Sequence, residues 1–127
     1  MSESIEMYLE SIYVIRNRQG YVRNIDIAHE MNFSKPTITQ QIKRLKAKGL
    51  VITDKEGMVQ LTNVGEHIAM MIYERHQELS RVLRFLGVDE KIAAEDACRI
   101  EHYISPETFD AIKAYFDPII GQDKSTD

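Results

Sequence analysis

Two short helical patterns joined by a tight turn constrain this chain more than any other feature. Residues 24–31 carry apolar side chains at the spacing of a two-turn helix, with Asn24 as the expected N-cap. Asn32 and Phe33 form the turn. Ser34-Lys35-Pro36 then opens a second helix with an N-cap serine and a proline in the first turn, where a missing N–H is tolerated. The arrangement predicts a helix-turn-helix.

The segments on either side extend this prediction to a winged helix-turn-helix over residues 5–62. Residues 4–18 have apolar side chains at helical spacing and stop at Gly20, and the second helix of the pair stops at Gly49. Residues 50–53 and 58–62 are β-prone runs separated by a turn that contains Gly57, which indicates a hairpin.

The second half of the chain predicts helices only. A long helix over residues 64–85, capped by Thr62 or Asn63, carries one apolar stripe; helices over 90–103, capped by Asp89, and over 105–116 follow. Residues from Asp117 onward are expected to form a frayed tail. The fold class is therefore mainly α with a small β-wing. Residues 1–62 are expected to form a winged helix-turn-helix domain, residues 63–120 a helical domain, and residues 121–127 a flexible tail.

Length and composition exclude several classes. A chain of 127 residues is too short for a multidomain enzyme, and its apolar runs are far shorter than the roughly 20 residues of a membrane span. The acidic N-terminus does not resemble a signal peptide, and the single cysteine permits no intrachain disulfide. We expect a cytoplasmic protein with no membrane partner.

The charge of the chain is unevenly distributed. Residues 14–55 contain nine Lys/Arg and three Asp/Glu, a local charge of +6 that leaves −10 for the rest of a chain whose total is −4. A basic module of this kind engages a polyanion. With the helix-turn-helix it predicts double-stranded DNA as partner, the second helix entering the major groove. The candidate DNA-binding residues are Ser34, Lys35, Pro36, Thr37, Gln40, Gln41, Lys43, Arg44 and Lys55.

Potential metal ligands gather in the acidic half. Cys98, Glu101 and His102 stand at i, i+3 and i+4 of the helix predicted over residues 90–103, so their side chains share one face. Met7 and Glu10 have the i, i+3 spacing on the first helix, and His76 lies on the long helix. This mixture of sulfur, nitrogen and oxygen donors suits Fe(II), Mn(II), Co(II) or Ni(II) better than a structural zinc site.

Together these segments resemble the diphtheria-toxin-repressor family of metal-dependent transcriptional repressors, in particular its short manganese-transport-regulator branch. The resemblance implies a homodimer that binds palindromic operators when a divalent metal links the first helix to the dimerisation helices. It assigns Met7, Cys98, Glu101 and His102 to one metal position, and Glu10 and His76, with Glu101 as a bridge, to a second. The matching segments are residues 5–13, 34–40, 75–76, 86–90 and 97–102.

Two positions make the chain a hybrid of the family's branches. The manganese-responsive branch has Asp where this chain has Met7 and Glu where it has Cys98. Met and Cys there resemble the iron-responsive branch, and soft donors favour Fe(II) over Mn(II), with Co(II), Ni(II) or Zn(II) as surrogates.

Alternative functions are a winged-helix regulator that senses an organic ligand, a redox sensor that acts through Cys98, and a small metalloenzyme. The sequence has no nucleophile motif and no Gly-rich phosphate loop, which disfavours an enzyme with a small-molecule substrate.

Overall fold

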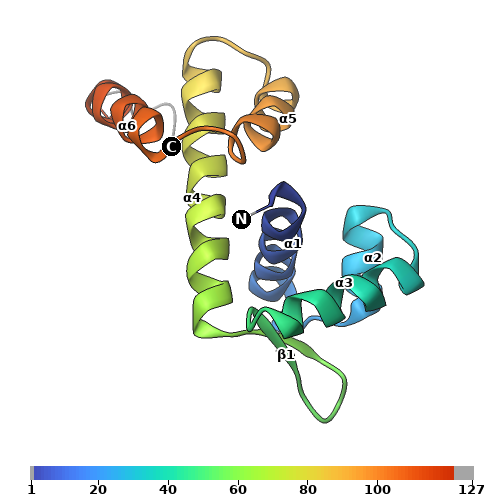
Figure 1. Cartoon of the computed structure of the whole chain (residues 1–127). Coiled ribbons are helices and arrows are strands. Elements are labelled where there is room, and N and C mark those ends of the chain that lie inside the picture. Colours follow the sequence, from blue (N-terminus) through green and yellow to red (C-terminus); the bar gives the residue numbers. More distant parts are fainter. Residues whose placement is uncertain (1, 122–127) are drawn as a thin grey trace. The chain divides into compact units, whose positions relative to one another are not determined.

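The computed structural model describes residues 2–121 and divides the chain into two compact units, residues 1–71 and 72–127. The first unit contains α1 (Glu3–Gln19), α2 (Asn24–Met31), α3 (Lys35–Ala47), β1 (Val51–Thr53) and β2 (Val59–Leu61). Helix α4 (Asn63–Phe85) begins in the first unit and ends in the second, which also contains α5 (Glu90–Ile100) and α6 (Pro106–Gly121) (Figure 1). The predicted fold class is confirmed.

The first unit is built around one apolar core. Its helices each contribute a stripe of aliphatic side chains, and the most deeply buried are Leu9, Ile12, Ile15, Ile27, Ile38 and Leu45, all at most 1% exposed. The ends of α1 are fixed locally, because the Ser2 side chain accepts from the Ile5 N–H and Gly20 adopts a left-handed conformation.

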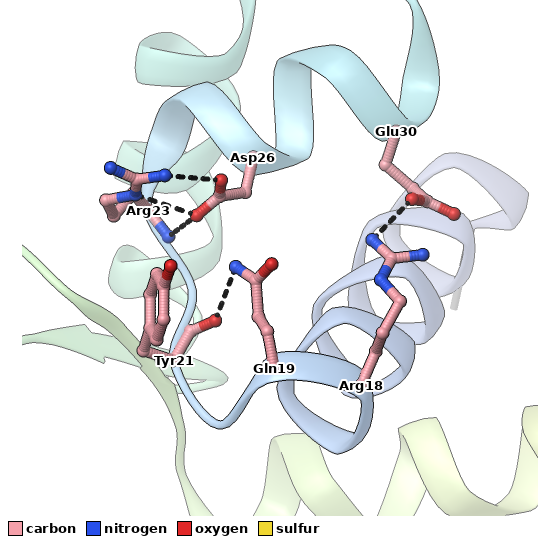
Figure 2. A network of polar contacts seen from close by, with 6 residues as sticks. All are labelled: Arg18, Gln19, Tyr21, Arg23, Asp26 and Glu30. Carbon is pink, nitrogen blue, oxygen red and sulfur yellow. Dashed lines mark hydrogen bonds and ion pairs between the residues drawn. The ribbon is translucent and has the colours of Figure 1, made fainter.

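The helix-turn-helix forms as predicted, with one correction at the start of α2. The expected cap, Asn24, is the first helical residue, and Arg23 is the N-cap. The backbone N–H and the guanidinium of Arg23 both donate to Asp26 (Figure 2), and this bonding holds the pKa of Asp26 below its usual range. Asn32 closes α2 at φ 58°, a left-handed geometry that Asn tolerates.

The predicted wing is a two-stranded antiparallel hairpin in which Ile52 pairs with Gln60. Asp54 organises the turn, since its Oδ1 accepts from the N–H groups of Glu56 and Met58 at 3.0 and 2.9 Å. The Val59 N–H donates to the Val22 carbonyl at 2.7 Å, which ties β2 to the extended link between α1 and α2.

In the second unit, α5 and α6 pack on the C-terminal part of α4 (Figure 1). Leu79, Ala97 and Phe109 form an apolar cluster from the three helices. Arg81 of α4 donates to Asp117 of α6 at 2.6 Å and to Glu78 at 3.3 Å. Burial raises the pKa of Glu78 to about 7, and the adjacent Asp117 adds to the rise.

The prediction of a frayed tail from Asp117 is wrong for residues 117–121, because α6 continues to Gly121. Pro118 removes one helical N–H, yet the helix persists through it. The physical reason is tertiary: Asp117 is bonded to Arg81, and Ile120 is only 1% exposed. The rest of the predicted tail, residues 122–127, lies outside the described residues.

Within residues 2–121, no helix is both long enough and apolar enough to cross a bilayer.

Gly65 sets how closely α4 approaches the wing. A Cβ at this position would lie 2.0 Å from the Leu50 carbonyl oxygen. Gly65→Ala should therefore destabilise the protein by about 1–3 kcal/mol, although alanine is the better helix former. Chemical denaturation measures the change. Gly121→Ala, where a Cβ meets nothing within 4 Å, is the control and should be close to neutral; equal effects of the two variants would contradict the prediction.

Candidate metal centre and DNA-binding surface

A buried carboxylate between two imidazoles is the chemical centre of the second unit. Glu101 has a fully buried side chain, and its Oε2 lies 2.9 Å from His76 Nδ1. Its Oε1 lies 3.3 Å from Nε2 of His102, whose side chain is 1% exposed. The structure thus brings together three of the predicted ligands, from α4 and from the turn after α5.

The local backbone explains how Glu101 turns inward. The helix predicted to continue to residue 103 ends at Ile100, and Glu101 is its C-cap, still in right-handed helical conformation. The N–H groups of Tyr103 and Ile104 both donate to the Ile100 carbonyl, which closes a further turn. Ala93, Ala97 and Glu101 are buried at successive four-residue steps, so the carboxylate continues the inner face of α5.

Cys98 lies in a different environment from the other two members of its predicted triplet. It is exposed on α5, whereas Glu101 and His102 are buried. The three side chains therefore do not share one equally buried face, since one residue of rotation from Ala97 moves Cys98 about 100° away from the core. Its thiol as a ligand stays a prediction.

Met7 and Glu10 lie on α1 in the first unit, one helical turn apart and both half-buried. Leu9 and Ile12 on the same helix are directed into the core of that unit. The participation of Met7 and Glu10 in a metal site also stays a prediction.

The donors of the second unit fit a divalent metal. A carboxylate removed from water needs full compensation, because desolvating an ion costs several kcal/mol. Within residues 2–121, however, no hydrogen bond reaches Glu101 Oε1. Two imidazoles and one carboxylate are a donor set that Mn, Fe and Zn ions accept. These residues would therefore hold a metal through His76, Glu101 and His102.

Arg75, which the sequence did not mark as a functional residue, contacts the same turn. Its Nη1 donates to the carbonyl oxygens of Glu101 and Ile104 at 3.2 and 3.0 Å. It lies in the segment of residues 75–76 that carries the family resemblance, but neither its residue type nor its spacing predicts contacts with main-chain carbonyls.

The predicted DNA-binding surface lies on α3 and the wing. Ser34 caps α3 by accepting from the Thr37 N–H at 3.3 Å, as predicted. The structure leaves eight of the nine candidate residues exposed, namely Ser34, Lys35, Pro36, Thr37, Gln40, Lys43, Arg44 and Lys55. The exception is Gln41, which is half-buried with its Oε1 inside. It stands three residues after Ile38 and four before Leu45, at the margin of the buried face.

The basic residues of the first unit fall into two groups. Arg16, Arg18 and Arg23 form ion pairs with Glu66, Glu30 and Asp26, and Figure 2 shows the last two pairs beside α2. The other group has no ion pair within the part of the chain that the structure describes, and all its members are exposed: Lys35, Lys43, Arg44, Lys46, Lys48 and Lys55. Among the described residues of the first unit, the positive charge available to an external anion is thus confined to α3, the residues that follow it, and the wing.

The chain matches two consecutive family profiles. Residues 1–59 match the iron dependent repressor N-terminal DNA binding domain, and residues 62–119 match the iron dependent repressor metal binding and dimerisation domain. It is 37% identical over 113 residues to the transcriptional regulator MntR of Escherichia coli, covering 89% of this chain and 73% of that protein. An uncharacterised HTH-type transcriptional regulator of Methanocaldococcus jannaschii is 34% identical, with 92% and 95% covered.

Solved structures agree with this result. A manganese-dependent transcriptional repressor in complex with manganese superposes with a TM-score of 0.81 at 27% identity, covering 89% of this chain and 52% of that one. The manganese regulator SloR gives a TM-score of 0.78 at 26% identity, covering 92% and 55%. The chain therefore spans about half the length of these solved structures.

The buried Glu101 charge should reduce the stability of the metal-free protein. Glu101→Gln keeps the shape and removes the charge, so we expect its unfolding free energy in chelator to rise by about 1 kcal/mol. Urea denaturation in EDTA measures this change. Glu95→Gln, at an exposed position of α5, should stay within about 0.5 kcal/mol of the unsubstituted protein. A clear loss of stability in Glu101→Gln would show that the carboxylate is fully compensated without metal.

Proposed function

The chain belongs to the iron-dependent repressor family of metal-dependent DNA-binding regulators, and from this premise we propose that it represses transcription when it binds Fe(II) or Mn(II). The observation that carries the proposal is the Glu101 carboxylate, fully buried between His76 and His102 with one oxygen lacking a hydrogen bond. Its genes would be those of metal uptake. Residues 1–62 would bind DNA, and residues 63–120 would bind metal and dimerise.

The proposed ligand set is the one that the resemblance to the family implies, and its members come from three helices and one turn. His76, Glu101 and His102 supply the donors of the second unit, and Cys98 adds a thiolate from α5. Met7 and Glu10 supply a thioether and a carboxylate from α1. When bound, a divalent cation held by these donors would supply the positive charge that compensates the Glu10 and Glu101 carboxylates.

Metal binding would favour the DNA-competent population of the protein. A ligand shifts an equilibrium only by its difference in affinity between two states, so metal must bind that population more tightly. By reciprocity, operator DNA should raise the metal affinity.

Fe(II) is the preferred metal of this proposal. The thioether of Met7 and the thiolate of Cys98 are softer than carboxylates, and soft donors favour Fe(II) over Mn(II). Mn(II) is the alternative, and it is supported by the likeness to manganese regulators.

The proposed functional form is a cytoplasmic homodimer on a palindromic operator. The apolar stripe of α4 remains partly uncovered at Met71, which is 43% exposed, and Leu86, directly after the helix, is 61% exposed, as a second copy would require. A two-fold dimer presents two α3 helices to half-sites about 34 Å apart, one turn of DNA.

The proposal is tested by anaerobic fluorescence anisotropy of a labelled operator fragment at fixed salt, with Fe(II), Mn(II) or chelator. Metal should raise operator affinity at least tenfold, about 1.4 kcal/mol of coupling. Glu101→Gln should lose this increase and remain folded, and Glu95→Gln should keep it. Equal affinity in chelator and in every metal would contradict metal sensing and favour a regulator of organic ligands.

The same titration examines the choice of metal. Cys98→Glu replaces the thiol by a hard carboxylate and should move the preference toward Mn(II). Cys98→Ser, which adds no carboxylate, is its matched control. An unchanged order of metals in both variants would remove Cys98 from the ligand set.

Two residues of α3, Gln40 and Lys43, are expected to have different roles in DNA binding: Gln40 contacts bases and Lys43 contacts phosphates. Gln40→Ala should cost about 1–3 kcal/mol on the operator and little on random DNA, because glutamine pairs with adenine through two hydrogen bonds. Lys43→Ala should weaken binding to both DNAs and reduce the slope of log affinity against log salt by about 1. Anisotropy on the two duplexes measures both effects. Loss of operator preference in Lys43→Ala instead would reverse the two assignments.

A further inference from the structure

Arg75 contacts the metal-binding turn without offering a metal ligand. Helix α5 ends at Ile100, and the N–H groups of Tyr103 and Ile104 donate to the Ile100 carbonyl, so residues 101–104 form a turn directly after the helix. The Arg75 guanidinium donates to two carbonyl oxygens of this turn, those of Glu101 and Ile104, at 3.2 and 3.0 Å. A cation at the C-terminal end of a helix is also favoured by the helix dipole.

The same guanidinium lies over the Phe109 ring of α6, with 5.6 Å between its central carbon and the ring centroid. A cation stacked on an aromatic face gains about 0.5–2 kcal/mol, depending on its solvation. One side chain of α4 therefore fixes both the turn after α5 and the first turns of α6.

Two neighbouring residues of α4 hold Glu101 at two separate points. Arg75 binds the main-chain carbonyl of Glu101, and His76 contacts its side-chain Oε2 at 2.9 Å. The hydrogen bond from Arg75 to the Glu101 carbonyl restricts the main chain at Glu101 and therefore the position of its carboxylate. It also restricts the position of the His102 imidazole, because His102 is the next residue in the chain.

We propose that Arg75 is a positioning residue of the metal centre: it holds the turn of residues 101–104 so that the Glu101 carboxylate and the His102 imidazole are aligned before metal binds. The inference rests on the proposed metal site. The positioning role differs from a purely structural one because Arg75 fixes groups that are themselves proposed ligands. Removing such a partner commonly lowers metal affinity by about 10–100-fold.

Arginine suits this role better than lysine. Its planar guanidinium can donate to two carbonyls in its own plane while one face stacks on Phe109. An ammonium group is a compact charge without a stacking face. Arg75→Lys therefore keeps the charge and the aliphatic stem but loses the combined geometry.

The test compares Arg75→Lys and Arg75→Ala with Arg81→Ala. Arg81 also joins α4 to α6, through Asp117, and within residues 2–121 its side chain donates to Glu78 and Asp117 but not to the turn of residues 101–104. Stability is measured by denaturation in chelator. The Mn(II) affinity is measured by electron paramagnetic resonance of the free ion, and the ligand geometry by the Co(II) absorption spectrum of the full chain.

We expect both Arg75 variants to lose at least tenfold in Mn(II) affinity and to change the Co(II) spectrum. Arg81→Ala should lose stability but keep the affinity within twofold and leave the spectrum unchanged. If Arg75→Ala does not fold, Arg75→Lys carries the comparison. The positioning role would be overturned if Arg75→Lys kept the Mn(II) affinity and Co(II) spectrum of the unsubstituted protein. It would also be overturned if Arg81→Ala lost as much Mn(II) affinity as the Arg75 variants. Absence of metal binding by the unsubstituted protein would instead overturn the proposed function together with the inference.

Discussion

The second unit depends on how the Glu101 carboxylate is accommodated away from water. Burying a charge is unfavourable unless partners replace its hydration. Here His76 bonds Oε2, while Oε1 lies 3.3 Å from His102 Nε2 without a hydrogen bond in the described part of the chain. The two imidazoles come from α4 and from the turn after α5, so the surroundings of one carboxylate depend on both elements. An apolar residue at this position would be easier to bury, and the retained charge is therefore best explained by what it can bind.

The first unit meets a different electrostatic requirement. Its arginines on α1 and before α2 are neutralised by acidic neighbours, among them the Arg23–Asp26 pair that caps α2. The cations of α3 and the wing have no such partners among the described residues and are exposed. The acidic side chains of the first unit thus neutralise the arginines on α1 and before α2, whereas positive charge remains on the exposed surface of α3 and the wing, which a duplex would face.

Local signals in the sequence predicted most of the fold. Ser34 and Asp89 are recognisable as caps, and Gly20 as a helix end, because these residues satisfy backbone groups within a few positions.

One error is local, because Arg23 and not Asn24 is the N-cap of α2. The other errors arose where distant residues decide. The pairing of Asp117 with Arg81 and the burial of Ile120 extend α6 past Pro118, and the margin position of Gln41 depends on the core beneath α3. The ligands His76, Glu101 and His102 were found from residue type, but Arg75 was not, since its partners are main-chain carbonyls that carry no sequence signature.

The unpaired cations of α3 and the wing also bear on how this protein would find its site. Contacts to phosphate through lysine and arginine do not depend on base sequence and permit sliding along a duplex. None of the six cations belongs to the proposed ligand set, so their attraction to DNA persists when metal is scarce. Metal-free copies would then stay loosely associated with the chromosome and scan it in one dimension. When the metal concentration rises, the protein molecules that bind metal would already be close to their operators. The delay before repression would then be shorter at low ionic strength than at high ionic strength.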